Sequence, residues 1–210
     1  MIFDARTGRS TIDASHAAAA SGHSGRHPDL AGTLTLYGPE LSYFTGKLEA
    51  VLRYMQLPYN RLTRGPMGEV AAKTGTAQVP ALGLTDGRIL TDTTPILEWL
   101  DARNPLAPIV PEDPVSAFFS WMLEDYADEW LWRPAMHYRW DYAESAKHQS
   151  RVLADADDSV PIPSFIKRYV ICNRQRKFFT VGDGVTTETW EHVEKSFYDT
   201  LAQFAGILKS

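Results

Sequence analysis

The spacing of apolar and polar residues predicts a strand followed by a helix near the start of the chain's folded part. Residues 33–37 alternate β-branched and apolar side chains, which is typical of a strand. Gly38-Pro39 then breaks the pattern. Apolar residues next recur at helical spacing, at Leu48, Val51, Leu52 and Met55. We therefore expect a sharp turn between this strand and an amphipathic helix.

The following segment predicts three more strands and two more helices. The strand signals lie at residues 59–63, 78–82 and 88–90. Asp86-Gly87 is a typical hairpin turn between the last two strands. A short irregular helix is expected at residues 66–74, and Thr94-Pro95 has the residue types that open a helix. The order β-α-β-α-β-β-α predicts a mixed four-stranded sheet covered by helices.

The pattern changes again after this α/β domain, which we place at residues 32–104. Prolines recur closely over residues 105–113, as in a linker. Only helical stripes follow, so residues 114–210 are expected to form an all-helical domain, with Pro134 interrupting its first helix. Residues 1–31 hold few large apolar side chains, which predicts a disordered tail.

Composition narrows the function classes. The chain has 210 residues, a net charge of −5 and a pI near 5.7, which argues against binding nucleic acid. No apolar run approaches the roughly 18 residues of a membrane helix. Cys172 is the only cysteine, which excludes a disulfide framework and a cysteine-rich metal site. We expect a cytoplasmic protein without a metal cofactor.

Ser42 stands where the first helix would begin. Unpaired backbone N–H groups at a helix N-terminus carry partial positive charge and stabilise an anion such as a thiolate. The first interpretation of Ser42 is a simple helix cap. The second is a hydroxyl that donates a hydrogen bond to a bound thiol. The segment itself leaves both interpretations open.

Three motifs in order resemble the glutathione S-transferase family. LYGPELSYFTGKLEAVLRYM at residues 36–55 is similar to the family's first strand, turn and helix. AQVPAL at residues 77–82 resembles the strand entered through a cis-proline, and LTDTTPILEWLD at residues 90–101 resembles the next helix start. The resemblance implies a thioredoxin-like N-terminal domain, a helical C-terminal domain and glutathione as co-substrate.

The resemblance also assigns roles at the glutathione site. It makes Ser42 the catalytic residue, which hydrogen-bonds the glutathione thiol and lowers its pKa. The residues implied to bind the rest of the tripeptide are Gln78, Val79, Pro80, Asp92 and Thr93. Val79 would pair with the peptide backbone, Asp92 would take the α-amine, and Thr93 the γ-glutamyl carboxylate. Gln78 would reach the glycine carboxylate, and Pro80 would be the cis residue.

The sequence departs from the family pattern at several points. Asp92 is shorter than the family's Glu or Gln, and Thr93 replaces a Ser. The turn after Ser42 contains no cysteine, so thiol–disulfide exchange by the protein itself is not expected. Tyr43 is a rival hydroxyl donor. The chain stops at Ser210, where the family continues, so we expect a truncated helical domain that exposes the apolar residues Trp190, Phe197 and Phe204.

The aromatic segment 130–140 has two interpretations. In the first interpretation, the segment forms part of a substrate pocket, with Tyr43 and Trp132 as walls and His137 as a polar contact. Alternatively it packs in a helical core, which is the commoner role of an aromatic stripe at helical spacing. The pattern favours the core interpretation. A general-base role for His137 has less support than either interpretation.

The sequence thus leads to two hypotheses. The first is a transferase that activates the glutathione thiol for attack on a small electrophile, acting as a homodimer. The second is a non-catalytic module that uses the same fold for binding or assembly.

Overall fold

The computed structural model describes residues 2–4, 9–11, 27–63, 67–156 and 162–209. The chain divides into two compact units, residues 1–112 and 113–210. The division falls at the end of the predicted linker. Each unit has its own secondary structure and its own buried residues, and each is described by itself below.

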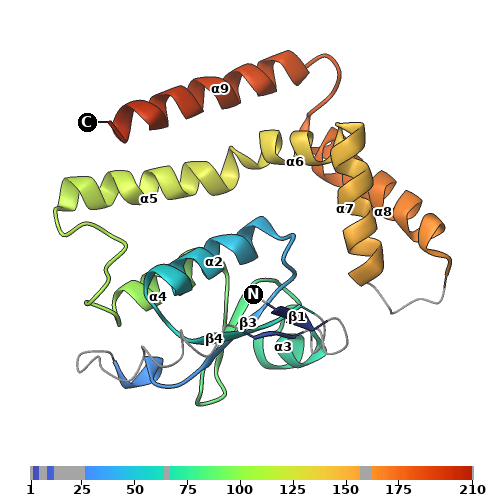
Figure 1. The fold of residues 1–210 in the computed structure, drawn as a ribbon. Helices are drawn as coiled ribbons and strands as arrows, with labels where there is room; N and C mark the ends of the chain where they lie inside the picture. Colours follow the sequence, from blue (N-terminus) through green and yellow to red (C-terminus); the bar gives the residue numbers. More distant parts are fainter. Residues whose placement is uncertain (1, 5–8, 12–26, 64–66, 157–161, 210) are drawn as a thin grey trace. The chain divides into compact units, whose positions relative to one another are not determined.

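The N-terminal unit contains the predicted alternation of strands and helices (Figure 1). Its main elements are β3 (Leu34–Tyr37), α2 (Tyr43–Tyr54), β4 (Tyr59–Leu62), α3 (Met67–Thr74), β5 (Ala81–Gly83), β6 (Ile89–Thr91) and α4 (Thr93–Asp101). The predicted order β-α-β-α-β-β-α is therefore confirmed.

Strand pairing makes β3 and β5 the middle of the four predicted strands. β3 runs parallel to β4 on one side and antiparallel to β5 on the other. β5 also pairs antiparallel with β6, after the tight turn at Asp86-Gly87. The position that matters most is Ala81, which lies opposite Tyr37 of β3 and opposite Thr91 of β6.

The sheet has two strands that the sequence did not predict. β1 (Ile2–Asp4) and β2 (Arg9–Thr11) pair with each other, and β2 pairs antiparallel with β4. They extend the strand order to β1-β2-β4-β3-β5-β6. An exposed edge of β4 would leave backbone groups unpaired, and added strands satisfy them. Residues 1, 5–8 and 12–26 of the predicted tail lie outside the described residues.

The end of the predicted tail is folded, so the prediction of disorder is wrong there. A 3₁₀ turn, η2 (Pro28–Leu30), buries Leu30 to 2% exposure. Asp29 forms ion pairs with Arg88 at 3.1 Å and with Arg103 at 3.2 Å. The Arg103 guanidinium also lies 4.4 Å above the ring of Trp99 in α4. Burial of Leu30 and the two ion pairs of Asp29 hold the segment Pro28–Leu30 in place, although its composition predicted disorder.

The core of the N-terminal unit lies between α2 and the sheet. Leu34 and Leu36 point to one face of β3, as alternate strand residues do, and both are fully buried. Leu48 and Leu52, one helical turn apart, bury the facing stripe of α2 completely. The hydrophobic periods of the sequence therefore predicted the correct faces of both elements.

A charged network joins α2 to β4 in this core. The Arg61 Nη1 atom lies 2.8 Å from Glu49 Oε2, and Arg61 is only 3% exposed. Tyr59 and Arg53 donate to the other Glu49 oxygen at 2.6 and 2.8 Å. Burial alone would raise the pKa of Glu49, but the hydrogen bonds from Tyr59 and Arg53 and the Arg61 charge outweigh it and lower the pKa.

The C-terminal unit is helical, as predicted (Figure 1). Its elements are α5 (Pro114–Glu129), α6 (Trp132–Trp140), α7 (Ala143–Ala156), α8 (Ser164–Phe179), the 3₁₀ turn η3 (Val181–Asp183) and α9 (Trp190–Ile207). Pro134 was expected to interrupt the first helix. The break lies just before it, and Pro134 sits in the first turn of α6, where its missing N–H removes no helical bond.

Apolar burial is uneven in the helical unit. Met136, Trp140 and Ala146 form a small core, and Cys172 packs against it from α8. α9 buries only Thr200 among its residues. Trp190, Phe197 and Phe204 are half-buried rather than exposed as expected, because Trp190 packs on His137 and Phe197 on Tyr138. Within the described residues, no helix is long and apolar enough to span a membrane.

We predict that Glu49→Gln destabilises the N-terminal unit by about 3 kcal/mol at neutral pH, because the buried Arg61 charge loses its nearer carboxylate and keeps only that of the exposed Glu40, 3.4 Å away. The pKa of Glu49 is lower in the folded protein, so its carboxylate stabilises the fold above the ordinary value of 4.5. That stabilisation disappears as the pH falls through the depressed pKa. Urea unfolding at several pH values should therefore show the difference between variant and wild type shrinking in acid.

Glu69→Gln is the matched control. Glu69 pairs with Lys73 at 2.9 Å, but both side chains are 45% exposed. An exposed pair of this kind contributes less than about 1 kcal/mol. Equal losses in the two variants would contradict a structural role for the Glu49–Arg61 pair.

Candidate functional site

Three separate segments meet at one end of the sheet. Because Ala81 pairs with both Tyr37 and Thr91, the end of β3, the start of β5 and the end of β6 coincide. The residues that continue from these points are Ser42, Gln78, Val79, Pro80, Asp92 and Thr93. All the residues predicted for glutathione binding thus lie in segments that leave the same end of one sheet.

Ser42 caps helix α2. Its Oγ atom accepts a hydrogen bond from the Thr45 backbone N–H at 3.3 Å, with the extended backbone of an N-cap residue. A hydroxyl group has lone pairs and one hydrogen, so accepting this bond leaves its O–H able to donate. The side chain is half-buried. The cap and the thiol-donor interpretations of Ser42 are therefore compatible rather than exclusive.

The turn before Ser42 depends on Gly38. A Cβ atom built on Gly38 would lie 2.3 Å from Thr45 Oγ1 and 3.0 Å from Thr45 Cγ2. Thr45 is fully buried in the first turn of α2. Only glycine lets the chain pass this close, so the contact fixes the distance between the end of β3 and the helix that Ser42 caps.

The segment before β5 offers an open backbone edge. The Val79-Pro80 peptide bond is cis, at the position where the sequence predicts it. Pro80 is buried, Val79 half-buried and Gln78 exposed. Within the described part of the chain, no hydrogen bond involves the Val79 backbone. Its N–H and C=O are thus suited to pair with an extended peptide, as a sheet edge does.

Asp92 and Thr93 form the start of α4. Asp92 is the N-cap residue, but its carboxylate makes no capping hydrogen bond and is exposed. Its φ of 72° lies in a region that L-residues seldom occupy, and such strain tends to occur at functional sites. Thr93 is 4% exposed. The free Asp92 carboxylate can bind an amine, and the N–H groups at the start of α4 can bind a carboxylate beside it. An α-amino acid group carries both.

The residues suggested for a substrate pocket are divided between the two units. Tyr43 is the first residue of α2, 43% exposed and next to Ser42. Trp132 lies in α6 of the other unit, where its Nε1–H donates to Asp183 at 3.0 Å and its ring packs edge-on against Phe179. These contacts place Trp132 in the packing of the helical unit.

His137 is a core residue, and its suggested place in a substrate pocket is corrected. It is fully buried, with Nδ1 2.8 Å from Asp141 Oδ2 and Nε2 3.0 Å from Glu194 Oε1. Glu194 also accepts from Tyr142, and the bonds from Tyr142 and His137 lower the pKa of Glu194. Both ring nitrogens are therefore occupied, and the ring joins α6 to α9. Sequence reasoning missed the contact with Glu194 because that residue is 57 positions away along the chain.

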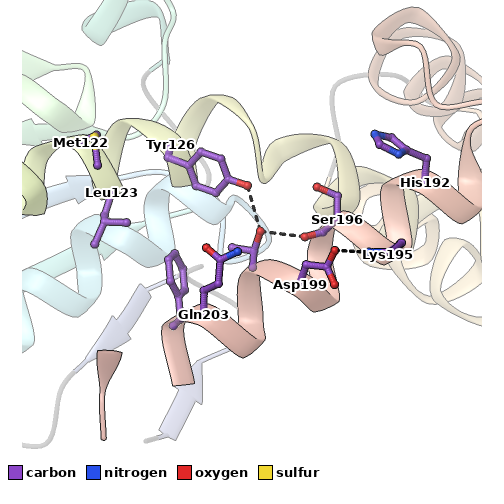
Figure 2. A pocket seen from close by; sticks show the side chains of 10 residues that line it. Met122, Leu123, Tyr126, His192, Lys195, Ser196, Asp199 and Gln203 are labelled. Atoms are coloured by element: carbon purple, nitrogen blue, oxygen red, sulfur yellow. Dashed lines mark hydrogen bonds and ion pairs between the residues drawn. The ribbon is translucent and has the colours of Figure 1, made fainter. Parts of the chain in front are cut away.

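The structure also contains a cavity that the sequence did not predict. It measures about 700 Å³ and lies between α5 and α9 of the helical unit (Figure 2). None of the predicted site residues lines it. Its only sequence signal is the broad aromatic and apolar face of α5, which also fits an ordinary core. Among the described residues, no cluster of three or more His, Cys, Asp and Glu side chains is arranged to hold a metal ion.

The fold and the site define a thioredoxin-like domain followed by a helical unit. Residues 36–108 match the sequence model of the glutathione S-transferase N-terminal domain. These residues therefore belong to the glutathione S-transferase family. The match covers the three segments that meet at the end of the sheet, and it ends before the helical unit.

Solved structures extend the similarity of fold. The beta-etherase LigF from Sphingobium sp. strain SYK-6 has a TM-score of 0.52 and 20% identity, over 82% of this chain and 72% of that protein. A glutathione S-transferase from Pseudomonas fluorescens Pf-5 has a TM-score of 0.45 and 17% identity, over 84% and 72%.

A third relative is a glutathione S-transferase from Methylobacterium radiotolerans, solved in complex with glutathione sulfonate. Its TM-score is 0.38 and its identity 18%, over 69% of this chain and 64% of its own, which is less than two thirds. No curated protein sequence matches the chain. At 20% identity and a TM-score of 0.52, the match to LigF shows the fold alone.

We predict that His137→Ala destabilises the helical unit by about 3 kcal/mol, because it removes the ring between Asp141 and Glu194 and leaves the buried Asp141 carboxylate only the partly exposed Arg176. The exposed His148 in α7 is the matched control, and His148→Ala should change stability by less than about 0.5 kcal/mol. Thermal unfolding measures both. A His137 variant of normal stability that had lost only enzymatic activity would instead restore a catalytic role.

Proposed function

We propose that the chain is a glutathione S-transferase-like enzyme that activates the glutathione thiol for attack on a small electrophile. The observation that carries the proposal is the double pairing of Ala81. It brings the Ser42 cap, the open Val79 backbone and the Asp92 carboxylate to the same end of the sheet. A transferase needs these groups together, because glutathione presents a thiol, a peptide backbone and an amino acid end.

Each residue has one role in this proposal. The Val79 N–H and C=O pair with the backbone of the tripeptide, and Pro80 shapes that edge. Asp92 binds the α-amine, and Thr93 binds the neighbouring carboxylate at the helix start. Gln78, which is exposed, reaches the glycine carboxylate at the other end.

Ser42 acts on the sulfur. Its hydroxyl donates a hydrogen bond to the developing thiolate at the N-terminus of α2, and both effects lower the pKa of the thiol. The thiol proton passes to solvent. The sulfur then forms a bond to the electrophile, and the leaving group departs with its electron pair. Ser42 keeps its own proton throughout, so its cap on α2 stays intact.

The alternative function is a non-catalytic binding or assembly module. It is favoured by the short reach of Asp92 compared with the family's Glu or Gln, and by exposed apolar side chains on α5 and α8, among them Phe118, Phe119, Phe165 and Tyr169. We also propose that the chain acts as a homodimer in the cytoplasm, for which these apolar surfaces and the single cysteine are the support.

Glutathione binding is the first test. We predict that glutathione at 100 times its Kd stabilises the protein by about 2.7 kcal/mol, because it binds only the folded state. A thermal-shift titration measures this, with glutathione esterified at the free α-carboxylate of its γ-glutamyl residue as the control ligand that lacks one anchoring charge. Absence of any shift at millimolar glutathione would refute the enzyme and leave the binding or assembly module.

Ser42→Ala separates the enzyme from the module. We expect turnover with an activated aryl halide to fall about 100-fold, as for loss of a donor to a developing anion, while glutathione affinity changes little. Ser42→Thr keeps both the cap and the hydroxyl and should retain most activity. Tyr43→Phe removes the rival donor and should leave turnover unchanged.

Two outcomes would count against the assignment. Unchanged turnover in Ser42→Ala would transfer the thiol-donor role to Tyr43, because Thr45 is fully buried. A wild-type protein that binds glutathione but turns over no electrophile would favour the module instead.

A further inference from the structure

The cavity between α5 and α9 has the size of a ligand site. Its volume of about 700 Å³ lies within the roughly 300–1,000 Å³ range of small-molecule pockets. All its lining residues come from two helices of the same unit. Its lining therefore belongs to the helical unit alone.

The α5 side of this cavity is apolar. Met122 and Leu123 line it from α5 (Figure 2), and Phe204 is among the residues that line it from α9. Met122 is 46% exposed although it faces this concave surface. A flexible thioether adapts its shape to a partner and makes favourable contacts with aromatic rings. This part of the cavity suits a flat aromatic molecule.

The middle of the cavity carries a directed polar pair. Thr200 Oγ1 donates its hydrogen to the Ser196 carbonyl at 2.9 Å. The hydroxyl has one hydrogen, so Tyr126 must be the donor in its 3.0 Å bond with Thr200. The Tyr126 oxygen then has only lone pairs left to offer. A ligand at this point must donate a hydrogen bond to it.

Charge at the cavity is balanced by neighbouring side chains. Lys195 and Asp199, one turn apart on α9, both line the cavity and form an ion pair with each other (Figure 2). Neither charge therefore requires a counterion from a ligand. An ionic ligand would lose its hydration without gaining a dedicated partner.

We propose that this cavity binds an uncharged aromatic molecule that carries a hydroxyl or amine hydrogen. The ring lies against Met122 and Leu123, and the hydrogen is donated to the Tyr126 oxygen. Binding in this cavity is expected without glutathione, because no residue of the N-terminal unit lines it.

Methionine methyl NMR of the whole protein tests the site directly, with naphthol as the probe. A bound ring shifts the Met122 methyl signal through its ring current, and we expect this shift to saturate with naphthol concentration. The internal controls are the buried Met55 in the N-terminal unit and Met136 in the helical core. Their signals should stay in place. Assignment of the Met122 signal follows from its loss in Met122→Leu.

A comparison of two ligands with two proteins tests the hydrogen bond. Methoxynaphthalene has the same rings as naphthol but no hydrogen to donate. We expect it to bind wild type about fivefold more weakly, as for loss of one hydrogen bond. In Tyr126→Phe the two ligands should bind equally. Tyr169→Phe, which changes a 72% exposed tyrosine on α8, should preserve the wild-type preference.

Blocking the cavity provides a second variant. Leu123→Trp fills the apolar end and should abolish the saturable Met122 shift. The proposal is overturned if Met122 does not respond, if Met136 or Met55 shifts equally, or if Leu123→Trp binds naphthol as wild type does. It is also overturned if Tyr126→Phe keeps the wild-type preference for naphthol.

Discussion

One strand position, Ala81, sets the geometry of the candidate site. It is fully buried and pairs with β3 on one side and β6 on the other, so neither neighbour can slip without disturbing both ladders. A slip of one residue would also turn every β5 side chain to the opposite face of the sheet. The positions of Ser42, Val79 and Asp92 relative to one another follow from this register. The chemistry assigned to them depends on backbone pairing more than on any single side chain.

Local patterns predicted most of the fold. The period of two at Leu34 and Leu36 and the helical spacing of Leu48 and Leu52 gave the correct faces, because burial alone decides them. Contacts between residues that are far apart in the sequence were not predicted. The ring of His137 lies between Asp141, four residues away, and Glu194, fifty-seven residues away. Only the packing of α9 on α6 brings Glu194 to it, and no periodicity encodes that pairing. The α5–α9 cavity was missed for the same reason.

Both units bury ionisable groups and satisfy them in similar ways. In the N-terminal unit the buried Arg61 is held by Glu49, which also accepts from Tyr59. In the helical unit the buried His137 lies between two carboxylates. Each network joins elements that are separate in the chain. Its hydrogen bonds fix the relative orientation of these elements more strictly than non-directional apolar contacts would. In α9, whose only buried residue is Thr200, such directed bonds carry much of the attachment. The two halves therefore depend on charge pairing as well as on their hydrophobic cores.

The stacking of Arg103 on Trp99 has an optical consequence. Trp99 is the sole tryptophan between residues 1 and 112, and the remaining ones all belong to the helical unit. A guanidinium 4.4 Å from the indole ring places a fixed positive charge beside this chromophore, and Asp29 holds that guanidinium from the other side. The emission of Trp99 is thus coupled to the anchoring of the segment at Pro28–Leu30. Substituting this one indole would divide the intrinsic fluorescence of the chain into separate signals for its two halves.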